Sequence, residues 1–161
     1  MEDITLRAIR VLKQVDLIAA EDTRVTRKLM SRNGIENKIT SYHNHNHQSK
    51  LPILLEALTG GGEIALVSDA GTPTLSDPGS ELIEVASQSD HAIIPVPGPS
   101  AITAALATSD LHRKGFTFIS FLPRKQSERI KYLDLLKAES RAIVAFEAPH
   151  RLIKSLGDIL F

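Results

Sequence analysis

The chain has 161 residues, of which 42% are hydrophobic and 24% are charged. This composition is typical of a globular protein with one full domain, or one domain and part of another. Nineteen basic residues balance nineteen acidic ones, so the overall charge does not indicate nucleic acid or membrane as a partner. The absence of cysteine excludes disulfides and thiolate chemistry and is typical of a cytoplasmic protein.

Membrane insertion and secretion find no support in the sequence. No apolar run approaches the roughly 20 residues that a membrane span requires. The first residues, MEDIT, are acidic and lack the apolar core of a signal peptide.

Helical and strand patterns alternate along the chain. The first helix is predicted by apolar residues at helical spacing, namely Ile4, Ala8, Val11, Leu12 and Val15. Further helices are predicted at 23–32, 51–58, 78–90, 100–108 and 127–138, and from 151 onward. Strands are predicted at 16–21, 38–43, 63–68, 92–96, 116–120 and 142–146. Asp77 is expected to cap the helix whose first position is Pro78.

This alternation predicts an α/β fold with a parallel sheet and right-handed crossovers. The strands are apolar throughout, so we expect helices on both faces of the sheet. The polar segment 110–115 indicates a domain boundary. We expect an N-terminal α/β domain over 1–112 and the beginning of a second α/β domain over 113–161. No strand precedes the first helix and no stop signal follows the last one, so the sequence favours a chain truncated at both ends.

Ligands of open α/β sheets bind beyond the carboxyl ends of the strands. The strand at 63–68 is followed there by the loop SDAGTP, residues 68–73. Gly71 permits a backbone conformation or close approach that a Cβ would forbid, and Asp69 can accept two hydrogen bonds. The alternative is a plain turn, which needs Asp, Gly and Pro as well. A second loop of small residues, PGPS at 97–100, favours a binding function, although neither loop is a phosphate-binding glycine motif.

Two other features carry charge or metal-binding groups. The segment HNHNH, residues 43–47, could place three histidines on one side of an extended chain. However, no carboxylate stands at a ligand-like spacing, so a polar loop is favoured over a metal site.

Residues 113–131 hold six basic residues and a single acidic one. Arg124 and Lys125 follow a strand end, where they suit the phosphates of a polyanionic substrate.

Five motifs occur in order: AEDTR (20–24), VSDAGTPTLSDPG (67–79), PVPGPSA (95–101), FLPRK (121–125) and EAPHRL (147–152). Together they closely resemble the family of ribosomal small-subunit RNA 2′-O-methyltransferase I enzymes, a branch of the tetrapyrrole methylase superfamily. The resemblance extends over essentially the whole chain. It implies S-adenosylmethionine as the methyl donor, the 2′-hydroxyl of a cytidine in small-subunit ribosomal RNA as the acceptor, two α/β domains and a homodimer. Family members normally begin with a strand and a GTPIGNL-type loop and continue well past Phe161, so the resemblance also implies a fragment.

The resemblance assigns roles to individual residues. The donor-binding residues it implies are Asp69, Ala70, Gly71, Thr72, Pro73, Ser100, Ala101 and Leu122. Arg124 and Lys125 are expected to contact RNA phosphates. Glu21 or Asp22 could serve as a base near the reacting hydroxyl. The alternative for these two carboxylates is a salt bridge to Arg24 or Arg27.

Two other functions remain open on the sequence alone. A methylase of a tetrapyrrole precursor would share the superfamily, and its substrate also carries several carboxylates. A non-catalytic RNA-binding module is possible for a chain that lacks the front loop. AEDTR and FLPRK favour RNA methylation over both.

Overall fold

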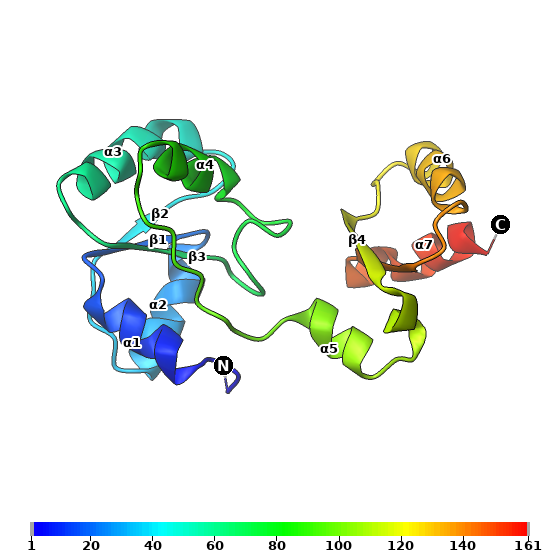
Figure 1. The fold of residues 1–161 in the computed structure, drawn as a ribbon, viewed down its shortest axis with the longest axis horizontal. Helices are drawn as coiled ribbons and strands as arrows, with labels where there is room; N and C mark the ends of the chain where they lie inside the picture. The colour runs from blue at the N-terminus through cyan, green and yellow to red at the C-terminus, as the bar shows by residue number, and fades with distance from the viewer. Residues whose placement is uncertain (1, 161) are drawn as a thin grey trace. The chain divides into compact units, whose positions relative to one another are not determined.

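The computed structural model describes residues 2–160, apart from the side chains of His112 and Arg113. The chain divides into two compact units, residues 1–100 and residues 101–161 (Figure 1). The boundary between domains that the sequence indicates at 110–115 stays a prediction.

The first unit is a parallel α/β unit. Its elements are α1 (Leu6–Gln14), β1 (Leu17–Ala20), α2 (Thr23–Arg32), β2 (Ile39–Ser41), α3 (His47–Thr59), β3 (Ile64–Val67) and α4 (Ser80–Gln88). The three strands form one sheet in the order β2-β1-β3, and both pairings are parallel. In the register of this sheet, Ile18 lies opposite Ile39 on one side and Ala65 on the other. The predicted parallel sheet is confirmed.

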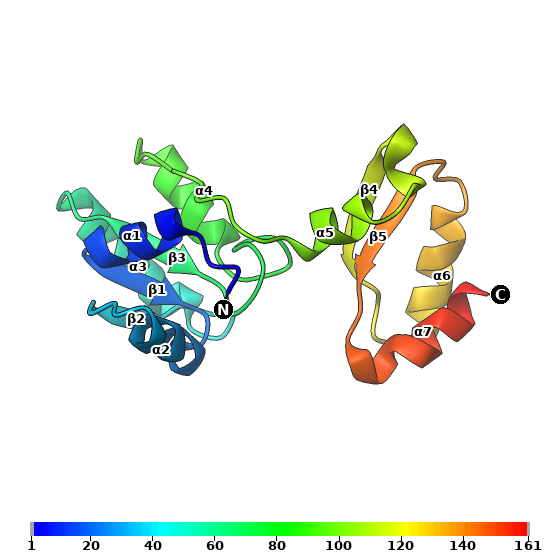
Figure 2. The ribbon, with the colours of Figure 1, turned by 90° about the horizontal axis from the view of Figure 1, so that it is seen from below.

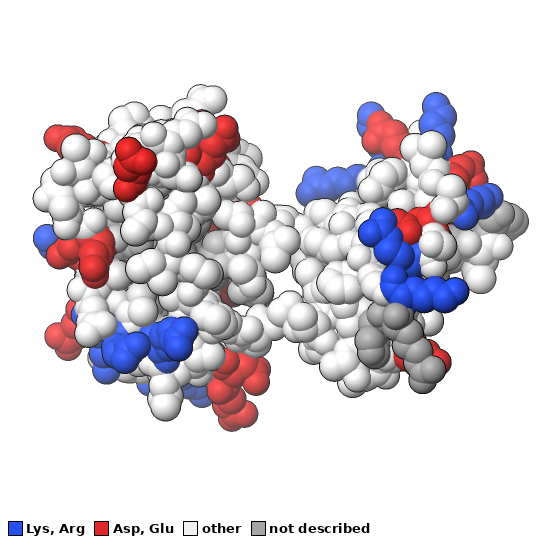
Figure 3. Space-filling view, in the orientation of Figure 1, with Lys and Arg blue, Asp and Glu red and all other residues white. Residues whose placement is uncertain are grey.

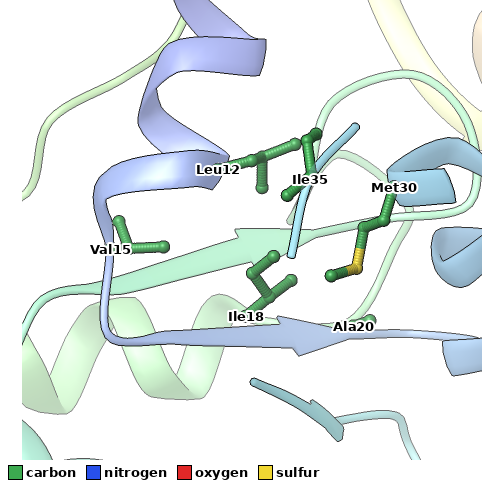
Figure 4. Close-up of a cluster of buried hydrophobic side chains, with 6 residues drawn as sticks. All are labelled: Leu12, Val15, Ile18, Ala20, Met30 and Ile35. Carbon is green, nitrogen blue, oxygen red and sulfur yellow. The ribbon is translucent and has the colours of Figure 1, made fainter. Parts of the chain in front are cut away.

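The central strand β1 is covered on both faces, as its uninterrupted apolar sequence predicts. Ile18 and Ala20 pack with residues from α1, from α2 and from the segment after α2, namely Leu12, Val15, Met30 and Ile35 (Figure 4). Ala19 points the opposite way and packs with Tyr42, Leu54 of α3 and Leu82 of α4. Alternate residues of a strand face opposite sides, so two separate apolar clusters anchor this sheet between two helix layers.

The second unit is smaller. Its elements are α5 (Ala101–Ala107), a 3₁₀ helix (Leu111–Lys114), β4 (Phe116–Phe121), α6 (Gln126–Leu136), β5 (Ala142–Phe146), a second 3₁₀ helix (Pro149–Arg151) and α7 (Leu152–Ile159). The strands β4 and β5 pair in parallel, and Figure 2 shows α6 and α7 beside them. The expectation of two covered faces is wrong here. Phe116, Phe121 and Ile143 are each 40–48% exposed, because this sheet has only two strands to bury its side chains.

Two predicted elements differ from the structure. Residues 92–96 do not form a strand. They are exposed, and Pro95 has no N–H to donate to a sheet. The helix predicted from Pro78 begins at Ser80 instead, with Gly79 as its N-cap residue at a φ of 127°. Asp77 therefore does not cap α4.

None of the helices within residues 2–160 is long and apolar enough to cross a membrane.

Candidate functional site

Two loops lie side by side at the carboxyl end of the first sheet because the strands before them, β1 and β3, are parallel neighbours. Glu21 and Asp22 follow β1, and Ser68 to Pro73 follow β3. The backbone N–H of Asp22 donates to Oδ1 of Asp69 at 3.1 Å, and the N–H of Asp69 donates to Oε2 of Glu21 at 3.3 Å. These reciprocal hydrogen bonds fasten the two predicted parts of the site to each other.

Glu21 and Asp77 are two carboxylates of this site whose pKa values are raised. Burial raises the pKa of Glu21 above the ordinary value of 4.5, and the charges of Asp77 and Asp69 raise it further. Burial also raises the pKa of Asp77, whose carboxylate accepts a hydrogen bond from Ser68. Carboxylates that repel one another in a partly buried place hold protons more tightly than they would in water. Of the two carboxylates after β1, Glu21 therefore has the raised pKa and takes up a proton more readily than Asp22, and its role as a base stays a prediction.

Asp22 has a different environment. Its carboxylate caps α2 by accepting the N–H of Arg24 at 2.8 Å, and it forms an ion pair with the Arg24 guanidinium at 2.6 Å. The hydrogen bonds from Arg24 lower the pKa of Asp22 to about 2. The alternative of a salt bridge to Arg24 is thus confirmed, and a catalytic role for Asp22 stays a prediction.

The loop after β3 is open to solvent at Asp69, Ala70, Gly71 and Thr72. Gly71 has a φ of 75°, and a Cβ added there would meet nothing within 4 Å, so glycine is required for the backbone angle rather than for space. Ser68 Oγ donates to the carbonyl of Ala70 at 3.1 Å, and the N–H of Leu75 donates to the carbonyl of Thr72 at 3.2 Å.

The segment behind this loop is strained. Thr74 and Ser76 have φ values of 73° and 70°, which residues with a Cβ rarely adopt. Such angles persist only where the surrounding structure imposes them, and they concentrate at functional sites. The strain therefore supports the prediction that residues 69–73 form a ligand-binding wall, a role that stays a prediction.

The histidine segment is not extended. It turns at residues 44–46, and His47 begins α3 with its ring Nδ1 2.6 Å from the Glu81 carboxylate. Among the described residues, no group of three or more His, Cys, Asp or Glu side chains is placed to hold a metal ion.

In the second unit, the loop after β4 carries Leu122, Arg124 and Lys125. Leu122 is buried, whereas Arg124 and Lys125 are exposed, and Lys125 pairs with Glu128 at 3.1 Å. Two arginines hold the backbone of this loop by hydrogen bonds to its carbonyls. Arg129 Nη1 donates to the carbonyls of Pro123 and Arg124 at 2.9 and 3.2 Å, and Arg151 Nη1 donates to that of Leu122 at 3.4 Å.

No local sequence pattern indicates the ion pair that fixes Arg129. This side chain is 5% exposed and bonds through Nε and Nη2 to Oδ2 of Asp158, at 2.7 and 2.5 Å. Hydrogen bonds from Gln126 and from Arg129 lower the pKa of Asp158. The two partners lie 29 residues apart on different helices, α6 and α7, so no local sequence signal connects them.

The remaining predicted residues, Ser100 and Ala101, stand at the end of the first unit and the start of the second. Ala101 begins α5, as the predicted helix at 100–108 implied. The sequence analysis assigns no role beside Glu21 to Ser68 or Asp77, although the charge of Asp77 acts on Glu21 and Ser68 donates a hydrogen bond to Asp77.

The fold and the paired loops define a class: parallel α/β proteins that carry a candidate binding site at the carboxyl ends of their strands. Within that class, residues 1–160 match the family described as Tetrapyrrole (Corrin/Porphyrin) Methylases, and the chain belongs to this family.

Curated relatives are similar over nearly the whole chain. A protein of Mesorhizobium japonicum named ribosomal RNA small subunit methyltransferase I is 47% identical over 99% of this chain and 54% of its own length. A protein of the same name from Bacillus subtilis is 46% identical over 98% of this chain and 54% of its own length. The chain thus spans about half the length of the curated relatives it matches.

Solved structures agree on the fold. A cobalt precorrin-4 methyltransferase of cobalamin biosynthesis matches with a TM-score of 0.66 at 19% identity, over 99% of this chain and 69% of the other. The methyltransferase CobJ matches with a TM-score of 0.63 at 18% identity, over 99% and 70%. The predicted tetrapyrrole-methylase-like fold class is confirmed.

Proposed function

We propose that this chain is part of an S-adenosylmethionine-dependent enzyme that methylates the 2′-hydroxyl of a cytidine in small-subunit ribosomal RNA. The observation that carries the proposal is the 42–47% identity, over nearly the whole chain, to relatives named ribosomal RNA small subunit methyltransferase I. Cytoplasmic location, association with the small ribosomal subunit and a homodimer follow from the same proposal.

The loops of the first unit suit the methyl donor. Residues 69–72 are exposed, the strained residues Thr74 and Ser76 follow them closely, and Oδ1 of Asp69 accepts the N–H of Asp22. The Oδ2 of Asp69 is not used in that hydrogen bond, and Asp69 is an exposed residue. That oxygen is available to a ribose diol or an ammonium group. We assign the donor to Asp69, Ala70, Gly71, Thr72, Pro73, Ser100, Ala101 and Leu122. S-adenosylmethionine supplies an electrophilic methyl group on a sulfonium.

The residues of the chain would then orient the acceptor hydroxyl and accept its proton. Transfer to a hydroxyl requires the acceptor oxygen to be aligned behind the methyl group, and much of the rate comes from that alignment. Of the two candidate bases, Glu21 has the raised pKa and Asp22 is held by Arg24. Glu21 is therefore our preferred base, with Asp22 second.

The charge distribution suits a polyanionic acceptor such as RNA. Residues 1–100 hold nine basic and thirteen acidic residues, a net charge of −4, whereas residues 101–161 hold ten and six, a net charge of +4. Figure 3 shows Lys and Arg side chains on the visible surface of the second unit. A basic unit attached to a donor-binding unit suits a phosphodiester substrate, with Arg124 and Lys125 as phosphate contacts.

The test is methyl transfer from tritiated S-adenosylmethionine to unmethylated small ribosomal subunits, with a tetrapyrrole precursor offered in parallel. We expect 2′-O-methylcytidine in nuclease digests of the RNA. Label that enters only the tetrapyrrole would establish the alternative of a tetrapyrrole precursor methylase. A folded protein that binds RNA but shows no heat of binding with S-adenosylmethionine would instead be a non-catalytic RNA-binding module.

A further inference from the structure

A hollow of about 430 Å³ opens on the second unit, at the start of α6 and beside α7. It is lined by Arg124, Gln126, Arg129 and Lys154. Three of these four residues are basic and none is acidic. The hollow includes one residue with an expected role in RNA binding, Arg124, and one to which nothing in the sequence gave a role, Lys154.

The three basic residues differ in whether an ion pair neutralises their charge. Arg129 is buried and neutralised by the Asp158 carboxylate at 2.5 Å. Arg124 and Lys154 are exposed, and within the described residues neither forms an ion pair. Lys125, by contrast, already pairs with Glu128. The hollow is therefore lined by two cations whose charge is not neutralised by an ion pair, and together they attract a negatively charged group.

The hollow is also preorganised on its Arg124 side. Arg129 donates to the backbone carbonyl of Arg124 at 3.2 Å and to that of Pro123 at 2.9 Å. Asp158 in turn holds Arg129 in place, and Gln126 Nε2 donates to the same carboxylate at 2.7 Å. Fixing the backbone beneath an exposed arginine lowers the ordering cost that a ligand must overcome.

We propose that this hollow seats a phosphate group of the RNA backbone, with Arg124 and Lys154 as its two charged contacts. The proposal rests on the proposed function and deepens it, because it adds Lys154 and gives the basic unit a defined phosphate position. Arg129 is a positioning residue in this site. Its charge is satisfied by Asp158, and it acts by holding the backbone that presents Arg124.

The test is the salt dependence of RNA binding by the 161-residue chain, measured by fluorescence anisotropy with a labelled single-stranded RNA of about 12 nucleotides. Each lost phosphate contact reduces the slope of log affinity against log salt by about 0.7 for a single strand, which is about fivefold in affinity at 0.1 M salt. We expect this loss for Arg124→Gln and again for Lys154→Gln. Lys131→Gln is the matched control, since Lys131 is exposed on α6 and does not line the hollow.

Three outcomes would contradict the proposed phosphate site. The unaltered chain would bind no RNA, the salt slope would be unchanged in both variants, or the Lys131 control would lose as much RNA affinity as they do. Inorganic phosphate is titrated as a competitor against unlabelled RNA at equal phosphate concentration. Equal displacement by the two would mean a site for free phosphate instead of RNA.

The experiments distinguish a failure of the proposed phosphate site from a failure of the proposed function. RNA methylation together with unchanged salt slopes would contradict the phosphate site and support the methyltransferase function. The expected change in slope without any methyl transfer would support the phosphate site and contradict the methyltransferase function.

Discussion

Glu21, Asp69 and Asp77 bring three carboxylates together at the ends of β1 and β3. A carboxyl group whose pKa is higher in the folded chain than in the unfolded chain binds its proton more tightly when folded. The folded state is then favoured while the group is protonated, and this advantage is lost as the pH rises from the unfolded pKa through the folded one. For Glu21 the loss begins near the ordinary value of 4.5 and extends above it.

We therefore expect Glu21→Gln to raise the free energy of unfolding at about pH 7.5 and to change it little below about pH 4.5. Glutamine keeps an acceptor for the Asp69 N–H and removes the charge. Urea unfolding at the two pH values measures the difference. Glu36→Gln is the matched control, because Glu36 is exposed and lies outside the site. An equal gain in both variants would mean that a general charge effect, and not the repulsion at the site, controls stability.

Tyr42 offers a second prediction at this scale. Its side chain is 1% exposed, and its hydroxyl, although it lies near the backbone of Leu82, forms no hydrogen bond of normal geometry in the described structure. A buried hydroxyl without a partner costs free energy, so its removal should not destabilise the fold. We expect Tyr42→Phe to leave the free energy of unfolding unchanged or to raise it by up to about 1 kcal/mol.

Thermal unfolding tests this, with Tyr132→Phe as the control at a half-buried tyrosine. A loss greater than about 1 kcal/mol in Tyr42→Phe would show that the hydroxyl has a hydrogen-bond partner after all.

At the scale of elements, the entry into α4 depends on Gly79. Its φ of 127° is a conformation that residues with a Cβ rarely adopt, and an added Cβ would lie 2.4 Å from Cδ2 of Leu66. Gly71 also has a positive φ, of 75°, but an added Cβ there would meet open space. A substitution at Gly71 therefore tests backbone strain alone, whereas a substitution at Gly79 tests backbone strain together with a steric clash.

We expect Gly79→Ala to lower the free energy of unfolding by roughly 3 kcal/mol and Gly71→Ala to lower it by about 1 kcal/mol. Urea unfolding of the two variants side by side makes the comparison. Equal losses would show that Leu66 moves aside at no cost and that only the backbone angle matters.

The elements that the sequence predicted well are those with local causes. The predicted helix at 23–32 has the bounds of α2, because Asp22 caps its start and Asn33-Gly34 ends it. The strand predicted at 92–96 failed because an apolar segment becomes a strand only when a neighbour provides hydrogen-bond partners. The start of α4 was misplaced because Asp77-Pro78 resembles a helix start, whereas the chain reaches Ser80 through the unusual angle of Gly79.

The same distinction holds for the site. The hydrogen bonds that join Glu21 and Asp22 to Asp69 follow from two neighbouring parallel strands, and the alternating elements predicted the parallel sheet but not which strands are neighbours. The pair of Arg129 with Asp158 and the hollow beside Lys154 depend on how α6 packs against α7. Packing between helices brings together residues that are distant in sequence, and no local pattern encodes that.

At the scale of the whole molecule, the unpaired edge of the first sheet bears on whether copies of the chain associate. In the sheet order β2-β1-β3, strand β3 is an edge strand whose outer hydrogen-bonding groups face no other described strand. In the same unit, Ile93, Ile94 and Val96 are 41%, 80% and 37% exposed in a segment that pairs with no strand. Exposed strand edges and exposed apolar segments both promote association between chains.

We therefore expect the 161-residue chain to self-associate in a concentration-dependent manner, and Ile94→Lys to weaken the association about tenfold. Burying one isoleucine contributes about 1.5 kcal/mol or more, and about 1.4 kcal/mol corresponds to a factor of ten. Sedimentation velocity over a range of concentrations measures the effect. Ser87→Lys adds the same charge at an exposed position of α4 and should leave the association unchanged. If both lysines weaken it equally, charge repulsion rather than the apolar segment accounts for the change, and an association that neither lysine alters must involve a different surface.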